Sequence, residues 1–116
     1  MMLYPKQPNR RKRKKHKESI LHTKDGTCYL CMKLEDDLSV KRGLQEHHIF
    51  GGPNRSLSEA EGLKVWLCMR HHTEGPEAVH NNAANMNILK RDGQRAYERT
   101  HTRDEFMRLI GKNYLE

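Results

Sequence analysis

The chain has 116 residues, of which 34% are hydrophobic and 6% aromatic, and its net charge is +7. A chain of this length makes one domain at most, and so small a hydrophobic fraction favours a fold that needs a further staple, such as a bound metal ion. No apolar run approaches the roughly 20 residues that span a bilayer, and none follows the N-terminal charges, so we expect a protein that is neither membrane-spanning nor secreted.

The positive charge is concentrated at the N-terminus. Eight Lys and Arg residues and no acidic residue precede position 18, whereas the remainder carries 14 basic and 15 acidic residues. Such a run repels itself and has little to bury, so we expect residues 1–18 to be a disordered tail and residues 19–116 to be the folded domain. Attraction to a polyanion predicts nucleic-acid contacts for the central part of the tail. These candidate residues are Arg10, Arg11, Lys12, Arg13, Lys14 and Lys15. A solubilising tail, or an import signal in a cell with a nucleus, is the alternative.

The three cysteines indicate a metal site. Cys28 and Cys31 form a Cys-x-x-Cys, and Cys68 and His71 form a distant Cys-x-x-His. Three cysteines cannot complete a set of disulfides, but three thiolates and one imidazole make an ordinary tetrahedral zinc set. The spacing therefore predicts a structural zinc ion and a reducing compartment, with two incidental buried cysteines as the alternative.

A β-hairpin is predicted in the middle of the chain. Residues 44–50 read as a first strand, in which alternation sends His47 and His48 to opposite faces and so to different roles. Residues 51–61 read as a glycine-containing loop and a short polar connection of about one helical turn. Residues 62–67 have the apolar and β-branched content of a second strand.

Helices are predicted after the hairpin. Residues 68–72 turn into a helix on which Cys68 and His71 share a face while His72 points elsewhere. Apolar residues at spacings of three and four over 82–99 indicate an amphipathic helix.

Two features mark the C-terminal helices. Gly93 weakens the helix over 82–99, and Thr102 with Glu105 forms a capping-box pattern for a last short helix that stops at Gly111. We expect both helices to be packing elements without chemistry of their own.

Taken together, the motifs resemble those of the HNH endonucleases. The order Cys-x-x-Cys, His-His-Ile, a glycine-containing loop and Leu-Cys-x-x-His-His is similar to this branch of the His-Me finger superfamily, which is built on a ββα-metal unit often joined to a zinc-knuckle treble clef. The string His-His-Ile-Phe-Gly-Gly and the terminal Phe-x-x-x-x-Gly-Lys-Asn-Tyr look like small HNH proteins of bacteriophages and prophages. The resemblance covers roughly residues 28–114.

The resemblance implies a fold and a location. The fold would be α+β, a small zinc-stapled treble clef or ββα-metal finger made of a β-hairpin and a helix, with additional C-terminal helices after the basic tail. A protein encoded by a phage would work in the cytoplasm of its bacterial host. The expected partner is DNA, most simply double-stranded, with phage packaging or recombination proteins as further candidates.

Roles follow by position. His48 falls where the family has its general base, and His47 and His72 fall where it binds a catalytic divalent ion, which could be Mg²⁺, Mn²⁺, Ni²⁺ or Zn²⁺. The family's middle Asn falls on Leu63 or, with a slip of one residue, on Gly62. Since that Asn steadies the loop or the base, another group must do so here, with Asn54 or a backbone carbonyl as candidates.

Three residues outside the motif are weighed from their own chemistry. His80 lies eight residues after His72 and can fold back as a third metal ligand or a phosphate contact, with local packing as the alternative. Arg55 is the better candidate for clamping a scissile phosphate, and Asn54 is a weaker nucleic-acid contact.

The activity implied by the resemblance is hydrolysis of DNA phosphodiester bonds to 5′-phosphate and 3′-hydroxyl ends. A divalent cation stabilises the charge that grows on the phosphate and on the leaving oxygen, and a neutral imidazole takes a proton from the attacking water. The alternative is a catalytically lapsed, zinc-bound nucleic-acid-binding or adaptor module of phage recombination or packaging machinery. A small-molecule hydrolase is disfavoured by the basic tail.

Overall fold

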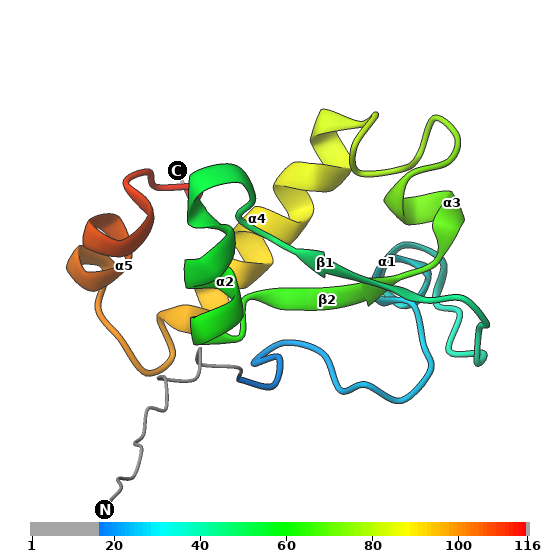
Figure 1. The fold of residues 1–116 in the computed structure, drawn as a ribbon, viewed down its shortest axis with the longest axis horizontal. Coiled ribbons are helices and arrows are strands. Elements are labelled where there is room, and N and C mark those ends of the chain that lie inside the picture. Colours follow the sequence, from blue (N-terminus) through cyan, green and yellow to red (C-terminus); the bar gives the residue numbers. More distant parts are fainter. Residues whose placement is uncertain (1–16, 116) are drawn as a thin grey trace, which may run out of the picture.

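The computed structural model describes residues 17–115, which form helices around one β-hairpin (Figure 1). In chain order the elements are α1 (Tyr29–Glu35), β1 (Gln45–His48), η2 (Gly52–Asn54), α2 (Arg55–Glu61), β2 (Lys64–Leu67), α3 (Met69–His72), α4 (Ala83–Tyr97) and α5 (Arg103–Ile110). The predicted α+β class is confirmed. The predicted nucleic-acid contacts of the tail, Arg10, Arg11, Lys12, Arg13, Lys14 and Lys15, lie outside the described residues.

The predicted hairpin is confirmed, with shorter strands than the sequence suggested. β1 and β2 pair antiparallel, and the register places Gln45 opposite Leu67, Glu46 opposite Trp66, His47 opposite Val65 and His48 opposite Lys64. One face of the hairpin carries His47, Val65 and Leu67, which are buried in the core. The other face carries the remaining cross-strand pairs. The hairpin thus separates the two adjacent histidines, as alternation along a strand requires.

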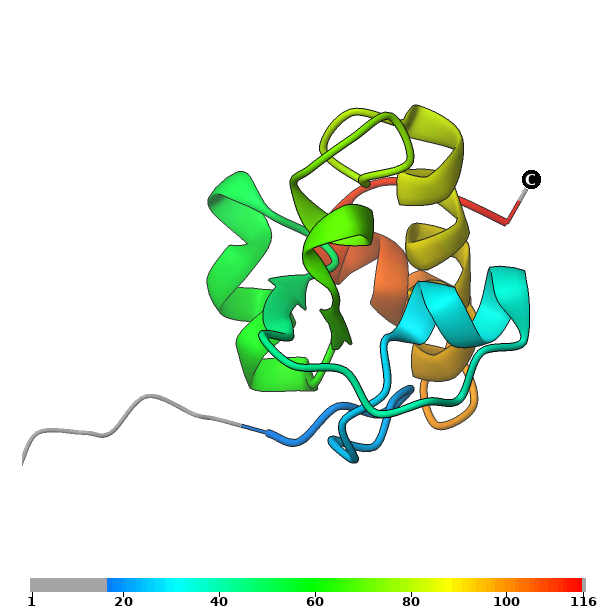
Figure 2. The same cartoon turned by 90° about the vertical axis from the view of Figure 1, so that its right-hand side faces the viewer.

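The connection between the strands is more ordered than predicted. It contains the two-turn helix α2, which lies on one side of the hairpin while α4 lies on the other (Figures 1 and 2). The buried hydroxyl of Ser58 donates to the Phe50 carbonyl at 2.9 Å and accepts from the Phe50 N–H at 3.1 Å, which fixes α2 to the end of β1. These bonds between α2 and the end of β1 explain a helix that local patterning underestimates.

Two features of the fold require glycine at position 62. Gly62 ends α2 with a φ of 73°, a conformation that glycine adopts without steric cost. A Cβ at this position would also overlap the carbonyl oxygen of Glu18, because the chain from Lys17 to Ile20 passes directly over it. The Gly62 carbonyl accepts the Ile20 N–H at 3.0 Å. The segment that follows the basic tail is therefore attached to the hairpin.

Helix α1 has no counterpart in the sequence prediction. It starts directly after Cys28, whose Sγ accepts the Cys31 N–H at 3.5 Å, and it ends at Asp36 in the left-handed conformation. Seven residues are too few for a clear hydrophobic period. Tyr29 and Leu30 are buried in the core, so packing on the hairpin stabilises what local propensity does not.

The two C-terminal helices are confirmed. Thr102 and Glu105 make both bonds of the predicted capping box, and Gly111 follows α5 with a φ of 93°. Gly93 is buried, and a Cβ there would lie 3.3 Å from Ile49 Cδ1. Its role is therefore to let α4 approach the end of β1, which offsets its poor helix propensity.

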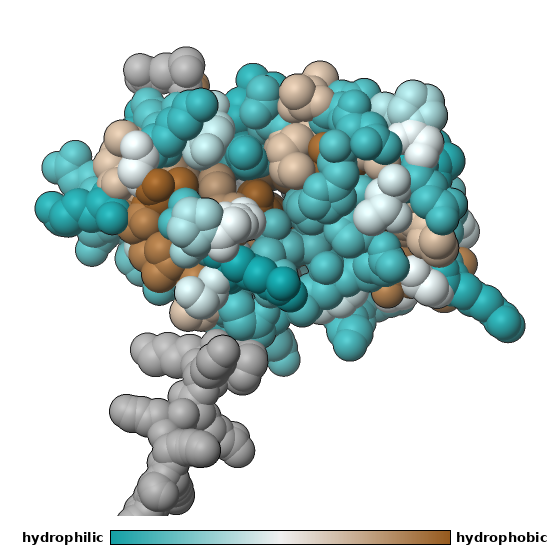
Figure 3. Space-filling view, turned by 45° about the horizontal axis from the view of Figure 1, so that its top comes forward, coloured by the Kyte–Doolittle hydropathy of each residue, from teal (hydrophilic) through white to brown (hydrophobic). Residues whose placement is uncertain are grey.

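The core gathers between the hairpin, α1, α4 and α5. Phe106 of α5 is fully buried, and its ring centroid lies 5.6 Å from that of Phe50 and 5.8 Å from that of Tyr97. The face shown in Figure 3 is mostly hydrophilic, with its main hydrophobic patch on the α5 side. None of the helices within residues 17–115 combines the length and apolar character that crossing a bilayer requires.

Candidate metal centres

Three sulfur atoms and one ring nitrogen meet beside the hairpin. Cys28 precedes α1 and Cys31 lies within it, while Cys68 caps α3 and His71 lies in that helix. The Nδ1 atom of His71 lies 3.6 Å from Cys28 Sγ, 3.4 Å from Cys31 Sγ and 3.6 Å from Cys68 Sγ. The Sγ atoms of Cys31 and Cys68 are 3.7 Å apart. The four predicted ligands therefore form one cluster.

The spacing of this cluster fits a tetrahedral ion. With Zn–S bonds of about 2.3 Å and a Zn–N bond of about 2.0 Å, tetrahedral angles place sulfurs about 3.8 Å from each other and about 3.5 Å from the nitrogen. Cys28, Cys31 and His71 are at most 1% exposed. Burial, followed by the neighbouring thiols, raises the pKa of Cys31 to about 12, and a dication among the donors would reverse that preference for the thiol. The cluster could hold a metal ion such as zinc.

An outer ring of charges orients the cluster. Arg70 donates to Glu35 at 2.8 Å and to Glu77 at 2.6 Å, and it lies 3.7 Å from Cys31 Sγ. The Nε2 atom of His71 is 3.6 Å from Glu35 and 3.8 Å from Glu77. An imidazole with one nitrogen toward thiolates and the other toward carboxylates has the orientation of a metal ligand. The sequence analysis did not single out Arg70, because its partners lie far away in the chain.

Three further imidazoles converge on the core-facing side of β1. His47 comes from β1, His72 from α3 and His80 from the loop before α4. Ring centroids are 5.2 Å apart for His47 and His72, 5.4 Å for His47 and His80, and 5.0 Å for His72 and His80. One nitrogen of each ring lies within 4.8 Å of the others. The predicted ligands, including His80, are thus close enough to share one divalent ion.

The surroundings of His47 and His72 favour neutral rings. Burial, with smaller contributions from His72 and His80, lowers the pKa of His47 to about 3, and its Nε2 is buried without a hydrogen-bond partner among the described residues. Burial and His80 lower the pKa of His72. The Nδ1 of His72 lies 2.6 Å from the amide oxygen of Gln45, so Nδ1–H donates and Nε2 keeps its lone pair. Neutral rings with free lone pairs are the metal-binding form.

Hydrogen bonds to backbone carbonyls hold the loop that carries His80. The Val79 N–H donates to the His71 carbonyl at 2.8 Å, which ties the loop to α3. Three asparagine side chains also donate to carbonyls within the loop: Asn81 to Gly75 at 3.0 Å, Asn82 to Pro76 at 3.3 Å and Asn85 to Glu77 at 2.9 Å. His80 is exposed at the end of this braced loop. Its place beside His72 therefore has a structural cause.

His48 lies on the opposite face of β1, in a different environment. Its Nε2 is 2.7 Å from a carboxylate oxygen of Glu59 and 3.9 Å from one of Glu46. Lys64 pairs with the same two carboxylates at 3.0 Å and 3.2 Å. Since a carboxylate only accepts, Nε2–H donates to Glu59, and this selects the tautomer of the neutral ring whose lone pair is on Nδ1. Glu59 was missed by the sequence analysis, because it lies on α2 and meets His48 across the fold.

The position of the family's middle Asn is filled by the core. The side chain of Leu63 is fully buried, and its carbonyl accepts the Ile49 N–H at 3.0 Å. With the Ser58 hydroxyl bonds to Phe50, this carbonyl holds the turn after β1. Asn54 makes no side-chain capping bond to α2, and Arg55 is exposed at the start of that helix.

The chain was compared with known proteins in three ways. No family model matches it, and neither a curated protein nor a solved structure matches it. The HNH assignment thus remains a prediction from the motifs.

Proposed function

We propose that this protein is a zinc-stapled, metal-dependent endonuclease of the HNH type that hydrolyses phosphodiester bonds of DNA. The observation that carries the proposal is the convergence of His47, His72 and His80, from a strand, a helix and a loop. A fourth imidazole, His48, follows His47 on the opposite face of β1 and is oriented by Glu59. Three convergent imidazoles and an oriented base supply the two functions that phosphodiester hydrolysis needs.

The residues divide the work between the two faces of β1. His47, His72 and His80 would hold a divalent ion, which supplies stabilisation of the charge on the phosphate and on the leaving oxygen. His48 accepts the proton of the attacking water on Nδ1, while Glu59 holds the ring and stabilises the imidazolium that results. Water bonds to phosphorus, the bond to the 3′-oxygen breaks, and that oxygen takes a proton from solvent.

The cysteine cluster makes the site possible in this proposal. α3 has only four residues and could not persist alone in water. This helix carries His71, which belongs to the cysteine cluster, and His72, which belongs to the histidine triad. We propose zinc as the ion of the cysteine cluster because its donor set and spacing match that metal.

A second candidate function is a zinc-bound nucleic-acid-binding or adaptor module of phage recombination or packaging machinery. It is favoured by one observation: the position of the family's middle Asn is occupied by Leu63, whose side chain belongs to the core.

Plasmid nicking separates the two candidates. Purified protein is incubated with supercoiled plasmid and Mg²⁺, Mn²⁺ or Ni²⁺, beside His48→Ala and a control, His101→Ala, whose ring stacks on Tyr97. We expect metal-dependent nicking by the wild type and the control, and a loss of about 100-fold or more in His48→Ala. DNA retention without a metal-dependent product from the wild type would favour the adaptor.

A further inference from the structure

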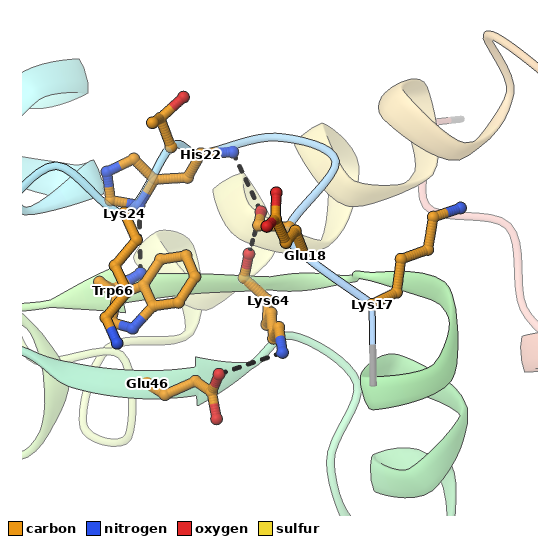
Figure 4. A pocket seen from close by; sticks show the side chains of 9 residues that line it. Lys17, Glu18, His22, Lys24, Glu46, Lys64 and Trp66 are labelled. Atoms are coloured by element: carbon orange, nitrogen blue, oxygen red, sulfur yellow. Dashed lines mark hydrogen bonds and ion pairs between the residues drawn. The ribbon is translucent and has the colours of Figure 1, made fainter. Parts of the chain in front are cut away.

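A cavity lies on the outer face of the hairpin, away from the histidine triad. It has a volume of about 480 Å³, within the usual range of small-ligand pockets, and it opens between residues 17–24 and the two strands (Figure 4). A second hollow of about 500 Å³ shares Lys24, Glu46 and Trp66 with it. Trp66 is thus bordered by open space on this face, and none of the proposed chemistry uses it.

The imidazole of His22 lies on one side of the indole of Trp66, with the two ring centroids 5.7 Å apart. The backbone N–H of Trp66 donates to His22 Nδ1 at 3.1 Å, which keeps the His22 ring beside this strand position. His22 is buried and is itself held by Thr27 at 3.1 Å. What covers the indole face is the exposed Lys24, whose Nζ lies 5.8 Å from the ring centroid. A long exposed lysine can move aside, so Trp66 offers a half-buried aromatic face with a movable cationic cover.

The charges around the cavity favour an anionic occupant. The lining carries three lysines and two glutamates, which gives it one more positive than negative charge: Lys17, Lys24 and Lys64 against Glu18 and Glu46. The chain that leads into Lys17 carries seven more Lys and Arg residues and no acid. Lysines beside an aromatic platform are the usual means of binding an unpaired nucleic-acid strand, with bases stacked on the ring and phosphates on the cations.

We infer that this cavity binds a single-stranded segment of DNA, with one unpaired base stacked on Trp66 and the flanking phosphates at Lys24 and Lys17. The bases of an intact duplex stack on one another, so the platform selects a strand that is open beside it. The inference rests on the proposed function for its partner and narrows the substrate to DNA with an unpaired stretch.

The cavity is also connected to the proposed base. Glu46 and Lys64 line it, and the same two side chains contact the pair formed by His48 and Glu59. Trp66 and Lys64 lie two residues apart on β2, a distance of roughly 7 Å along a strand. A strand anchored on Trp66 would therefore lie beside His48.

The single tryptophan of the chain makes the test direct. Trp66 fluorescence is followed in full-length His48→Ala protein without added divalent ions, so that no DNA is cut. The probes are oligothymidylate of roughly ten nucleotides, an abasic strand of the same length, the matching duplex and oligouridylate. We expect saturable quenching by oligothymidylate and much weaker quenching by the abasic strand and the duplex. Equal quenching by oligothymidylate, the abasic strand and the duplex, or quenching by oligouridylate alone, would overturn the inference.

Variants give an independent measurement by anisotropy of a labelled oligothymidylate. Trp66→Leu should weaken binding about tenfold, the effect of losing one stacked base, and Lys24→Gln should weaken it less. The matched controls are Tyr114→Leu and Lys112→Gln. These two residues form a similar pair on the C-terminal segment, where the Nζ atom of Lys112 lies 5.2 Å from the centroid of the Tyr114 ring. Unchanged affinity in Trp66→Leu would show that no base stacks on the indole and would overturn the inference. Quenching without nicking by the wild type would reject the nuclease alone, and nicking without quenching would reject the cavity alone.

Discussion

At the scale of single residues, the main feature is the different treatment of two neighbouring histidines. His47 is buried among other imidazoles, whereas His48 donates to a carboxylate that Lys64 holds in place. Glu59 is therefore the residue through which α2 acts on the proposed base. Its carboxylate fixes both the orientation and the tautomer of the ring.

Replacing Glu59 with Gln tests this arrangement. The amide has the same shape but no charge, so it stabilises the imidazolium less, and we expect nicking to fall by about 10- to 100-fold. DNA affinity, measured by anisotropy, should stay unchanged. Glu61→Gln, two residues further along α2, is the matched control and should keep full activity. Full activity in Glu59→Gln would remove Glu59 from the mechanism.

At the scale of elements, the segment from Lys17 to Thr27 fastens the hairpin from outside. Ser19 donates to the Lys64 carbonyl at 2.5 Å, Ile20 donates to the Gly62 carbonyl, and His22 accepts from Trp66. The close approach of this segment depends on Gly62.

Comparing Gly62→Ala with Gly43→Ala separates the cost of a steric contact from the cost of the left-handed backbone conformation. Both glycines have a φ near 70°, but a Cβ at Gly43 meets nothing within 4 Å, whereas one at Gly62 meets the Glu18 carbonyl. We expect Gly43→Ala to lower the free energy of unfolding by about 1 kcal/mol, the cost of the left-handed conformation. Gly62→Ala should cost a further 1 to 3 kcal/mol, roughly the range for overpacking. Urea unfolding measures both, and equal losses would contradict the contact.

The same segment should be sensitive to acid. Burial lowers the pKa of His22 below its ordinary value of 6.5. Below pH 6.5 the unfolded chain therefore binds a proton that the folded chain does not, so this stability is complete above that pH and declines as the pH falls toward the lower folded pKa. We expect the wild type to lose more stability than His22→Gln between about pH 7.5 and about pH 5.5, as measured by urea unfolding. Equal losses would exclude this role.

At the scale of the whole molecule, the two candidate metal centres share one short helix. His71 and His72 are neighbours in α3, yet His71 faces the thiols while His72 faces the other two histidines of the triad. We expect the cysteine cluster to form without the triad, and the triad to require the helix that the cluster holds.

Metal analysis of two variants tests this one-way dependence. We expect the wild type to retain one zinc ion through mild chelation and to bind a second, weaker divalent ion. His72→Ala should lose only the second ion, while Cys31→Ser should lose both, as native mass spectrometry would show. Retention of the second ion by Cys31→Ser would make the centres independent.

The sequence predicts the parts of this structure that depend on local spacing. Cys28 with Cys31, and Cys68 with His71, are pairs three residues apart, so the cluster could be predicted from the chain alone. Contacts between residues distant in sequence could not: Glu59 meets His48 across 11 positions, and Arg70 meets Glu35 across 35. Helix α1 was also missed, because packing rather than its own pattern stabilises it.

The adjacency of His71 and His72 also bears on when the protein becomes active. On the proposed function, a newly made chain would not assemble its nuclease site until the thiols had bound their ion, so it would not cut the surrounding DNA during synthesis. Zinc starvation or oxidation of a single thiol would return it to that safe condition. The ion of the cysteine cluster would then control the nuclease activity as well as the stability of the fold.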